Sequence, residues 1–269
     1  MVTPLSGRVG IFQGRLVPSA TGELQCPPGE RWADELASAG ALGLSHVELF
    51  TEQVLDPTNL VWTPEGRAAL RRTASSSGVE LVSLCSEEPI AVALDVSASG
   101  LADRLVPAAA DLRLEIVVLA MDGASNVSPR SALRLAAAVD AVARPLADVG
   151  TRVAVELAVP AADGRAFVAL VSTPIGVCYD VGNATAAGYA PADEIAALAE
   201  LVWHVHAKDK DAQGRNVRFG TGEVDFAGAF AALRAVGYDG WITIEATRGD
   251  DPVATAAAHR AFLLALDPT

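Results

Sequence analysis

The sequence predicts an α/β protein built as one (β/α)8 TIM barrel over residues 1–269. Short apolar runs rich in Val, Ile and Leu alternate with helical stretches about eight times along the chain. Strands of a parallel sheet have this composition because helices cover both of its faces. Eight such units in a chain of this length close most naturally into a barrel. An open doubly wound sheet is the alternative, but no G-x-G-x-x-G follows the first apolar run.

The strands are predicted from the apolar runs at 8–13, 46–50, 79–85, 115–121, 152–157, 175–181, 202–209 and 241–246. Two helices are predicted to start at Thr63-Pro64 and Ser128-Pro129, because proline is tolerated at the first helical position. A third is predicted to start at Asp225. Helix ends are predicted just before three glycines that suit a left-handed cap: Gly78, Gly150 and Gly237.

The composition excludes several classes of protein. The formal net charge is −13, and such a surface repels nucleic-acid phosphate and anionic membranes. Three cysteines in so long a chain do not make a disulfide framework and fit a reducing cytoplasm. We expect no signal peptide and no membrane span, because the first residues lack an apolar run after a basic start and no long apolar stretch follows.

Polar side chains lie at the carboxyl ends of the last four predicted strands: Glu156, Asp180, His206 and Glu245. In a barrel these ends form the mouth where active sites are built. A carboxylate among valines and isoleucines must be paired or bound to a cation, because an isolated buried charge costs several kcal/mol. Three carboxylates and one imidazole suit Mn²⁺, Mg²⁺, Co²⁺ or Zn²⁺. Taken singly, Glu156 could face solvent and His206 could be a hydrogen-bonded core histidine.

With these residues the sequence resembles the xylose isomerase-like TIM barrels, the sugar-phosphate isomerase/epimerase superfamily. It looks most like the L-xylulose (L-ribulose) 5-phosphate 3-epimerases and the ketose 3-epimerases. The resemblance is carried by VAVE (153–156), YDVGN (179–183), VHAKD (205–209), NVRFGTGEVDF (216–226) and GYDGWITIE (237–245), and more weakly by GRLVP (14–18) and ALGLSHVEL (41–49).

The resemblance implies one bound divalent metal ion (Mn, Zn, Co or Mg), held by Glu156, Asp180, His206 and Glu245. It implies that the two glutamates form the acid/base pair and that Asn183 lies beside a sugar or sugar-phosphate substrate. A homo-oligomer, either dimer or tetramer, is also implied. Epimerases of free ketoses more often carry histidine in place of Asn183, and an arginine where this chain has Ala212, so the exact substrate stays open.

Ketose 3-epimerisation removes the proton at C3, holds an enediolate and returns a proton to the opposite face. Two bases on opposite sides of the sugar are therefore needed. Glu156 and Glu245 come from the fifth and eighth predicted strands, so they can flank a substrate. A metal ion chelated by O2 and O3 would stabilise the developing negative charge.

Three basic residues in and after the seventh strand are expected to bind substrate: Lys208, Arg215 and Arg218. Phosphate groups often bind in the loops after strands seven and eight of such barrels. The alternative for Lys208 is a solvent-facing pair with a neighbouring aspartate. Glu48, at the end of the second strand, is expected to contact the substrate or a group behind the metal ligands.

Other reactions remain open on the same four ligands. An aldose–ketose, hydroxypyruvate or inosose isomerase or dehydratase also moves a proton beside a metal-bound carbonyl. A DNA-repair endonuclease of this fold needs a three-zinc cluster with several histidines and a basic face, which four histidines and a charge of −13 disfavour. A catalytically inactive barrel would bind no metal.

Overall fold

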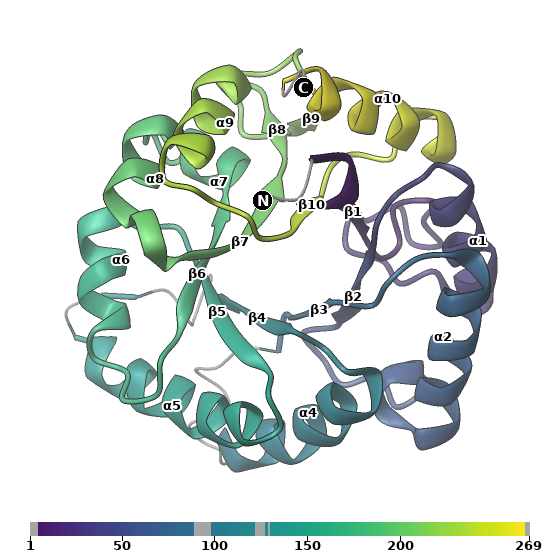
Figure 1. Cartoon of the computed structure of the whole chain (residues 1–269), viewed down its shortest axis with the longest axis horizontal. Helices are drawn as coiled ribbons and strands as arrows, with labels where there is room; N and C mark the ends of the chain where they lie inside the picture. Colours follow the sequence, from purple (N-terminus) through teal and green to yellow (C-terminus); the bar gives the residue numbers. More distant parts are fainter. Residues whose placement is uncertain (1–4, 89–97, 122–126, 129, 267–269) are drawn as a thin grey trace.

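The computed structural model describes residues 5–88, 98–121, 127–128 and 130–266. Eight parallel strands close into a barrel in the order β1-β10-β7-β6-β5-β4-β3-β2 (Figure 1). They are β1 (Val9–Phe12), β2 (Val47–Thr51), β3 (Ser83–Ser86), β4 (Ile116–Met121), β5 (Arg152–Leu157), β6 (Gly176–Asp180), β7 (Val202–Ala207) and β10 (Ile242–Ile244). Each lies within one predicted run, apart from one residue at the ends of β2 and β3, so the (β/α)8 prediction is confirmed.

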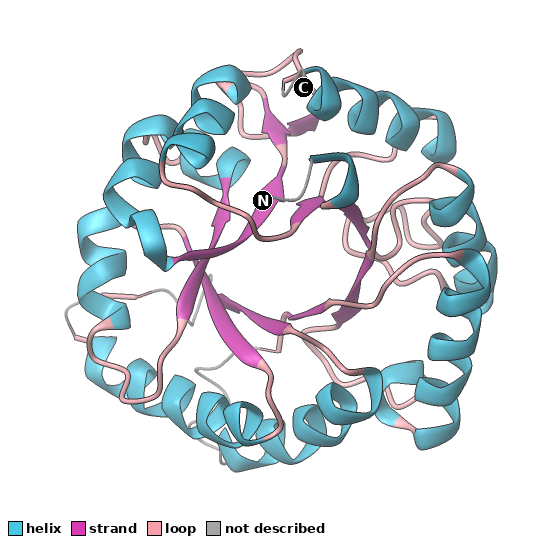
Figure 2. Cartoon of the chain, in the orientation of Figure 1, coloured by secondary structure: helices cyan, strands magenta, loops and turns pink. Residues whose placement is uncertain are grey.

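Helices surround the barrel (Figure 2). They are α1 (Trp32–Ala41), α2 (Pro64–Ser77), α4 (Ala98–Leu112), α5 (Ala132–Asp148), α6 (Ala161–Val168), α7 (Val181–Ala186), α8 (Pro191–Leu198), α9 (Phe226–Ala235) and α10 (Pro252–Ala265). The predicted cap residues Thr63 and Asp225 each accept a backbone N–H with their side chains. The three predicted end-cap glycines all have positive φ.

One helix start differs from the prediction. Helix α5 begins at Ala132, with Ser131 as its N-cap. The carbonyl of Ser128 accepts the amides of Ser131 and Ala132, so Ser128 heads a separate turn before the helix. Pro129, its predicted partner, lies outside the described residues.

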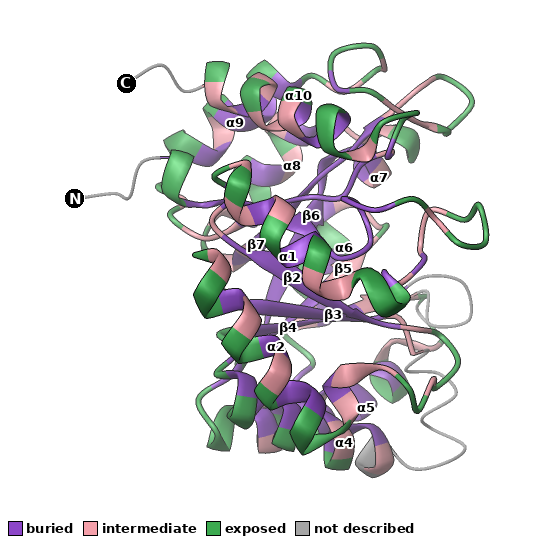
Figure 3. Ribbon diagram, turned by 90° about the vertical axis from the view of Figure 1, so that its right-hand side faces the viewer, coloured by how far each residue is buried: buried purple, intermediate pink, exposed green. Residues whose placement is uncertain are grey.

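The strands are buried on both faces (Figure 3). Because side chains alternate along a strand, one set faces the helices and the other faces the barrel interior. The outward set joins helix residues in a large apolar core. The inward set forms a small second cluster that includes Phe12, Phe50 and Cys178. Buried polar side chains, among them Glu48, His204 and Thr243, occupy the rest of the interior and lie directly behind the site described below.

A short antiparallel hairpin, β8 (Asp209–Lys210) with β9 (Asn216–Val217), follows β7 at the mouth. Among the described residues, no helix is both long and apolar enough to cross a lipid bilayer. The three cysteines are buried and unpaired.

Candidate active site at the barrel mouth

The four predicted ligands come together at the mouth. Glu156 is in β5, Asp180 ends β6, His206 is in β7 and Glu245 directly follows β10. These strands are neighbours in the closed sheet, and Asp180 pairs in register with His206. One donor atom from each residue lies within 4.8 Å of those of the other three. The fold therefore brings three carboxylates and one imidazole around a single point.

The spacing of these donor atoms fits a divalent cation. His206 Nδ1 lies 3.0 Å from Glu245 Oε2 and 3.3 Å from Glu156 Oε2. Donors at about 2.1 Å from one metal ion are roughly 3.0–3.4 Å apart when adjacent, in octahedral or tetrahedral geometry. His206 Nδ1 is fully buried and has no hydrogen-bond partner, although it faces two carboxylates. A cation is the group that would satisfy both the bare nitrogen and the clustered charges.

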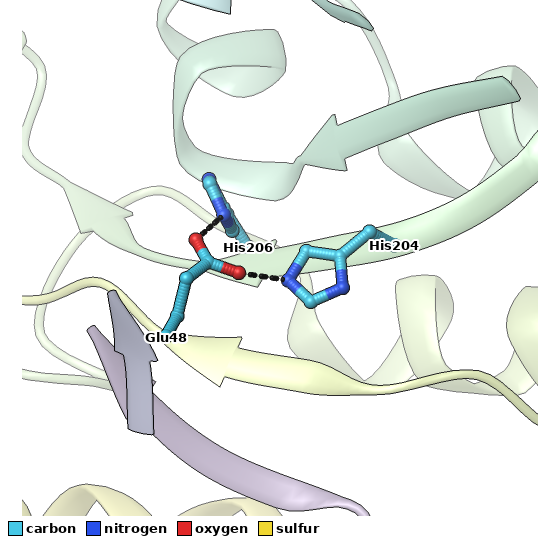
Figure 4. A group of neighbouring side chains, drawn as sticks. All are labelled: Glu48, His204 and His206. Carbon is cyan, nitrogen blue, oxygen red and sulfur yellow. Dashed lines mark hydrogen bonds and ion pairs between the residues drawn. The ribbon is translucent and has the colours of Figure 1, made fainter. Parts of the chain in front are cut away.

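A second cluster beneath this group consists of Glu48, His204 and His206 (Figure 4). Glu48 Oε1 lies 2.7 Å from His206 Nε2, and Glu48 Oε2 lies 2.6 Å from His204 Nε2. These separations are those of strong hydrogen bonds and leave no room for an ion between the atoms. All three side chains have no solvent exposure. Burial would raise the pKa of Glu48, but the two imidazoles outweigh it and hold that pKa well below its usual range.

The position of Glu48 corrects the expectation that it binds substrate. Both of its oxygens are occupied by imidazoles, and it does not line the cavity above. Its side chain points from β2 across the barrel interior to β7 (Figure 4). Glu48 therefore lies behind the candidate metal ligands, which was the other expectation for this residue.

Lys208 and Asn183 hold the outer oxygens of the carboxylates. Lys208 Nζ lies 2.9 Å from both Asp180 Oδ2 and Glu245 Oε1. Asn183 Nδ2 donates to Glu156 Oε1 at 2.8 Å. Burial would lower the pKa of Lys208, but the surrounding carboxylates outweigh it and raise that pKa above its usual value. Both residues line the cavity, so each can reach a bound ligand.

The loop after β1 supplies two residues to the site, Arg15 and Gln25, that the pattern of polar strand ends did not identify. Gln25 Nε2 donates to Glu245 Oε1 at 3.0 Å and to Glu87 Oε1 at 2.7 Å. Arg15 contacts Gln25 Oε1 and lies 3.7 Å from Glu245 Oε1. Burial lowers the pKa of Arg15 to about 10. The place of Arg15 just after a strand was a signal, whereas Gln25 lies in irregular sequence with none. Buried Glu35 anchors this loop by accepting two of its backbone amides.

A cavity of about 260 Å³ opens at this site, and two of the four candidate ligands, Glu156 and Glu245, line it. It is lined by Leu24, Gln25, Gln53, Cys85, Glu87, Ala120, Met121, Glu156, Leu157, Ala158, Asn183, Lys208 and Glu245. Neither Arg215 nor Arg218 is among these residues, so the structure does not bring either of them to the cavity. Arg215 binds Asp211 beside the turn of the β8–β9 hairpin, with 73% of its side chain exposed. Arg218 is exposed just beyond β9. Both arginines lie in the segment after β7, as the sequence indicates, but the sequence does not show that their side chains point away from the cavity.

The chain resembles sugar isomerases and epimerases along nearly its whole length. The family model described as xylose isomerase-like TIM barrel matches residues 36–266. L-ribulose-5-phosphate 3-epimerase UlaE of Escherichia coli (strain K12) is 28% identical, over 93% of this chain and 94% of that protein. Among solved structures, D-allulose 3-epimerase from Methylomonas sp. has a TM-score of 0.74 and 20% identity, covering 99% of this chain and 100% of that one. A xylose isomerase-like TIM barrel protein from Mycobacterium smegmatis, in complex with magnesium, has a TM-score of 0.74 and 17% identity, covering 98% of each chain.

Proposed function

The chain belongs to the xylose isomerase-like TIM barrel family, and we propose that it is a divalent-metal-dependent sugar isomerase that epimerises a ketose, or its 5-phosphate, at C3. The observation that carries this proposal is the convergence of Glu156, Asp180, His206 and Glu245 beneath a cavity. The curated relative is a 3-epimerase of a ketose phosphate, which supports the same reaction for this chain. The magnesium complex of a structural neighbour supports a divalent metal ion as cofactor.

The proposed metal ion is Mn²⁺, Zn²⁺, Co²⁺ or Mg²⁺, held by those four side chains. A bound divalent ion would polarise the substrate carbonyl and lower the cost of negative charge beside it. His206 offers a neutral nitrogen at Nδ1, and the carboxylates offer the negative charge that neutralises the ion. Lys208 adds a positive charge next to Asp180 and Glu245, which reduces the repulsion among the carboxylates.

Glu156 and Glu245 are the proposed acid/base pair. They come from β5 and the end of β10, which are separated by β6 and β7, so a sugar in the cavity has one carboxylate on each side. One glutamate removes the C3 proton and the other, protonated, supplies a proton to the opposite face. Asn183 holds Glu156, and Gln25 with Lys208 holds Glu245, so neither carboxylate is free to turn away from the substrate.

The direct test is proton NMR in D₂O with a panel of ketoses, ketose 5-phosphates and inososes, together with elemental analysis of the purified protein. We expect a bound divalent metal, and deuterium incorporation at C3 of one ketose or ketose phosphate. Glu245→Gln and Glu156→Gln should each lower the rate about 10²–10⁴-fold in at least one direction, which is the usual contribution of a positioned acid or base. Glu80→Gln, on an exposed residue between α2 and β3, should leave the rate unchanged.

Full activity in Glu245→Gln would refute the acid/base assignment. Deuterium at C1 with formation of an aldose would replace epimerisation by aldose–ketose isomerisation on the same site. Loss of water from an inosose would indicate a dehydratase. A purified protein without metal, inactive after addition of all four ions, would refute the proposal as a whole.

Three further features belong to the same proposal. We propose that residues 1–269 form one domain, that the protein acts in the cytoplasm and that it assembles as a homodimer or homotetramer. The buried, unpaired cysteines support a reducing compartment. Analytical ultracentrifugation tests the assembly, and a monomer over micromolar concentrations would refute it.

A further inference from the structure

Glu48 is a fully buried acidic residue that does not line the cavity and yet touches a candidate metal ligand. Its two imidazole partners come from β7, which is separated from β2 by β1 and β10 in the closed sheet (Figure 4). A buried carboxylate is costly unless each oxygen is hydrogen-bonded. Glu48 meets this condition: Oε1 faces His206 Nε2 at 2.7 Å, and Oε2 contacts Ser83 Oγ and His204 Nε2, each at 2.6 Å.

The contact at Oε1 determines which nitrogen of His206 carries the proton. An ionised carboxylate only accepts hydrogen bonds, so His206 donates from Nε2. A neutral imidazole has one N–H, so Nδ1 is left with its lone pair free. That lone pair faces Glu156 Oε2 and Glu245 Oε2, the position of the proposed cation. The ring of Phe12 packs edge-on against the imidazole of His206, with 5.9 Å between the ring centroids, and further restricts the rotation of the imidazole.

Glu48 is itself held by a network that does not reach the cavity. Thr243 Oγ1 lies 3.4 Å from Glu48 Oε2, and it also contacts His204 Nε2 and His46 Nε2, each at 3.0 Å. All of these side chains are buried inside the barrel. A rigid chain of hydrogen bonds therefore runs from the interior to the back of His206.

We propose that Glu48 is a positioning residue that fixes the orientation and tautomer of His206, so that Nδ1 is presented to the metal ion. This inference rests on the proposed function, because it assumes that the four side chains at the mouth bind a metal. It extends that function to a residue that acts without touching substrate or cofactor. Carboxylates that accept the second N–H of a ligating histidine commonly affect metal affinity 10–100-fold.

The test is Glu48→Gln, which keeps the shape of the side chain and removes its charge. The amide can accept from only one of the two imidazoles, and its NH₂ group opposes the N–H of the other. Titration of the metal-free protein with Co²⁺ by calorimetry should show binding about 10–100-fold weaker than in the wild type. The matched control is His259→Gln, because His259 is also buried but stacks on Phe219, outside the network that holds Glu48. That variant should bind Co²⁺ as the wild type does.

A second measurement needs no variant. In ¹⁵N-histidine-labelled protein loaded with Zn²⁺, only four histidines contribute signals. His206 should carry its proton on Nε2, slowly exchanging and shifted downfield by the short hydrogen bond, with Nδ1 unprotonated. His206 protonated at Nδ1, or wild-type Co²⁺ affinity in a folded Glu48→Gln protein, would overturn the inference. Should Glu48→Gln fail to fold, the Zn²⁺-loaded spectrum decides alone.

These results separate the inference from the function it rests on. Metal binding that depends on Glu48 in a protein that turns over no sugar would refute the epimerase and leave the positioning role intact. Turnover of a ketose by wild type and Glu48→Gln alike, with equal metal affinity, would refute the positioning role only. A wild-type chain that binds no divalent metal would refute both.

Discussion

Asp209 offers a sharp test of how the loop beside the site is held. Its carboxylate has no solvent exposure and accepts three backbone amides from the segment between β9 and α9. Oδ2 accepts from Gly220 at 2.9 Å and from Gly222 at 3.0 Å, and Oδ1 accepts from Val224 at 3.3 Å. The side chain of Asp209, directly after Lys208, therefore holds the backbone of residues 220–224, which lead from the mouth of the barrel to α9.

The structure sets the size of the effect of Asp209→Asn. The amide oxygen can replace Oδ2 and keep both glycine bonds, but the NH₂ group then faces the amide of Val224. Hydrogen bonds to charged groups contribute about 1.5–3 kcal/mol and neutral ones about 0.5–1.5 kcal/mol, so two bonds lose roughly 1 kcal/mol each. A buried amide without an acceptor adds about 1–3 kcal/mol. The expected cost is on the order of 3–5 kcal/mol, which reaches at most the lower end of the roughly 5–15 kcal/mol stability of a typical domain.

Urea denaturation and amide hydrogen exchange measure this cost. We expect a lower free energy of unfolding for Asp209→Asn and faster exchange at Gly220 and Gly222. Asp225→Asn is the matched control, because Asp225 caps α9 on the same segment and asparagine caps helices equally well. Equal stability of the two variants, with unchanged exchange at both glycines, would show that the carboxylate does not organise this loop.

Two other predictions concern packing and pH. Burial, with a smaller contribution from Arg218, lowers the pKa of His259 to about 4. Between pH 6.5 and pH 4 the unfolded chain therefore binds a proton at His259 that the folded protein does not, which favours unfolding. Stability should therefore fall by about 1–2 kcal/mol between about pH 7 and pH 5, and denaturation of His259→Gln should show a shallower fall. A Cβ on Gly182 would lie 2.7 Å from the carbonyl oxygen of Lys208, so Gly182→Ala should lower the melting temperature and weaken metal binding. In Gly164→Ala the nearest atoms are side-chain carbons at 3.8 Å or more, and both properties should stay unchanged.

The candidate ligands could be predicted from sequence because each is a polar residue at the end of an apolar strand. Glu156, Asp180, His206 and Glu245 occupy four successive strands, and the closed order of a parallel barrel places such ends at one mouth. Asn183 and Lys208 are within three residues of those strand ends, so their place beside the site followed from the same pattern. Local periodicity and the chirality of the fold were sufficient for these residues.

The remaining features depend on contacts that periodicity does not encode. Glu48 meets His206 across the barrel, 158 positions later in the chain, and only the closed interior shows that its oxygens are occupied. Gln25 reaches Glu245 from a loop whose path is set by backbone bonds to Glu35. The Arg215 side chain points toward solvent, where it forms an ion pair with Asp211 of the same hairpin. Loop direction and cross-barrel pairing were the two kinds of information that the sequence lacked.

The pairing of β1 with β10 has a consequence for synthesis of the protein. Val9 is in register with Ile242, so the first strand of the barrel finds one of its two neighbours only when the last strand has left the ribosome. Glu245, directly after that strand, completes the candidate ligand set at the same moment. A nascent chain thus exposes two unpaired sheet edges and cannot assemble the four donors until translation is nearly finished. Binding of the proposed metal ion should therefore follow translation, and premature termination before β10 should yield an aggregation-prone product.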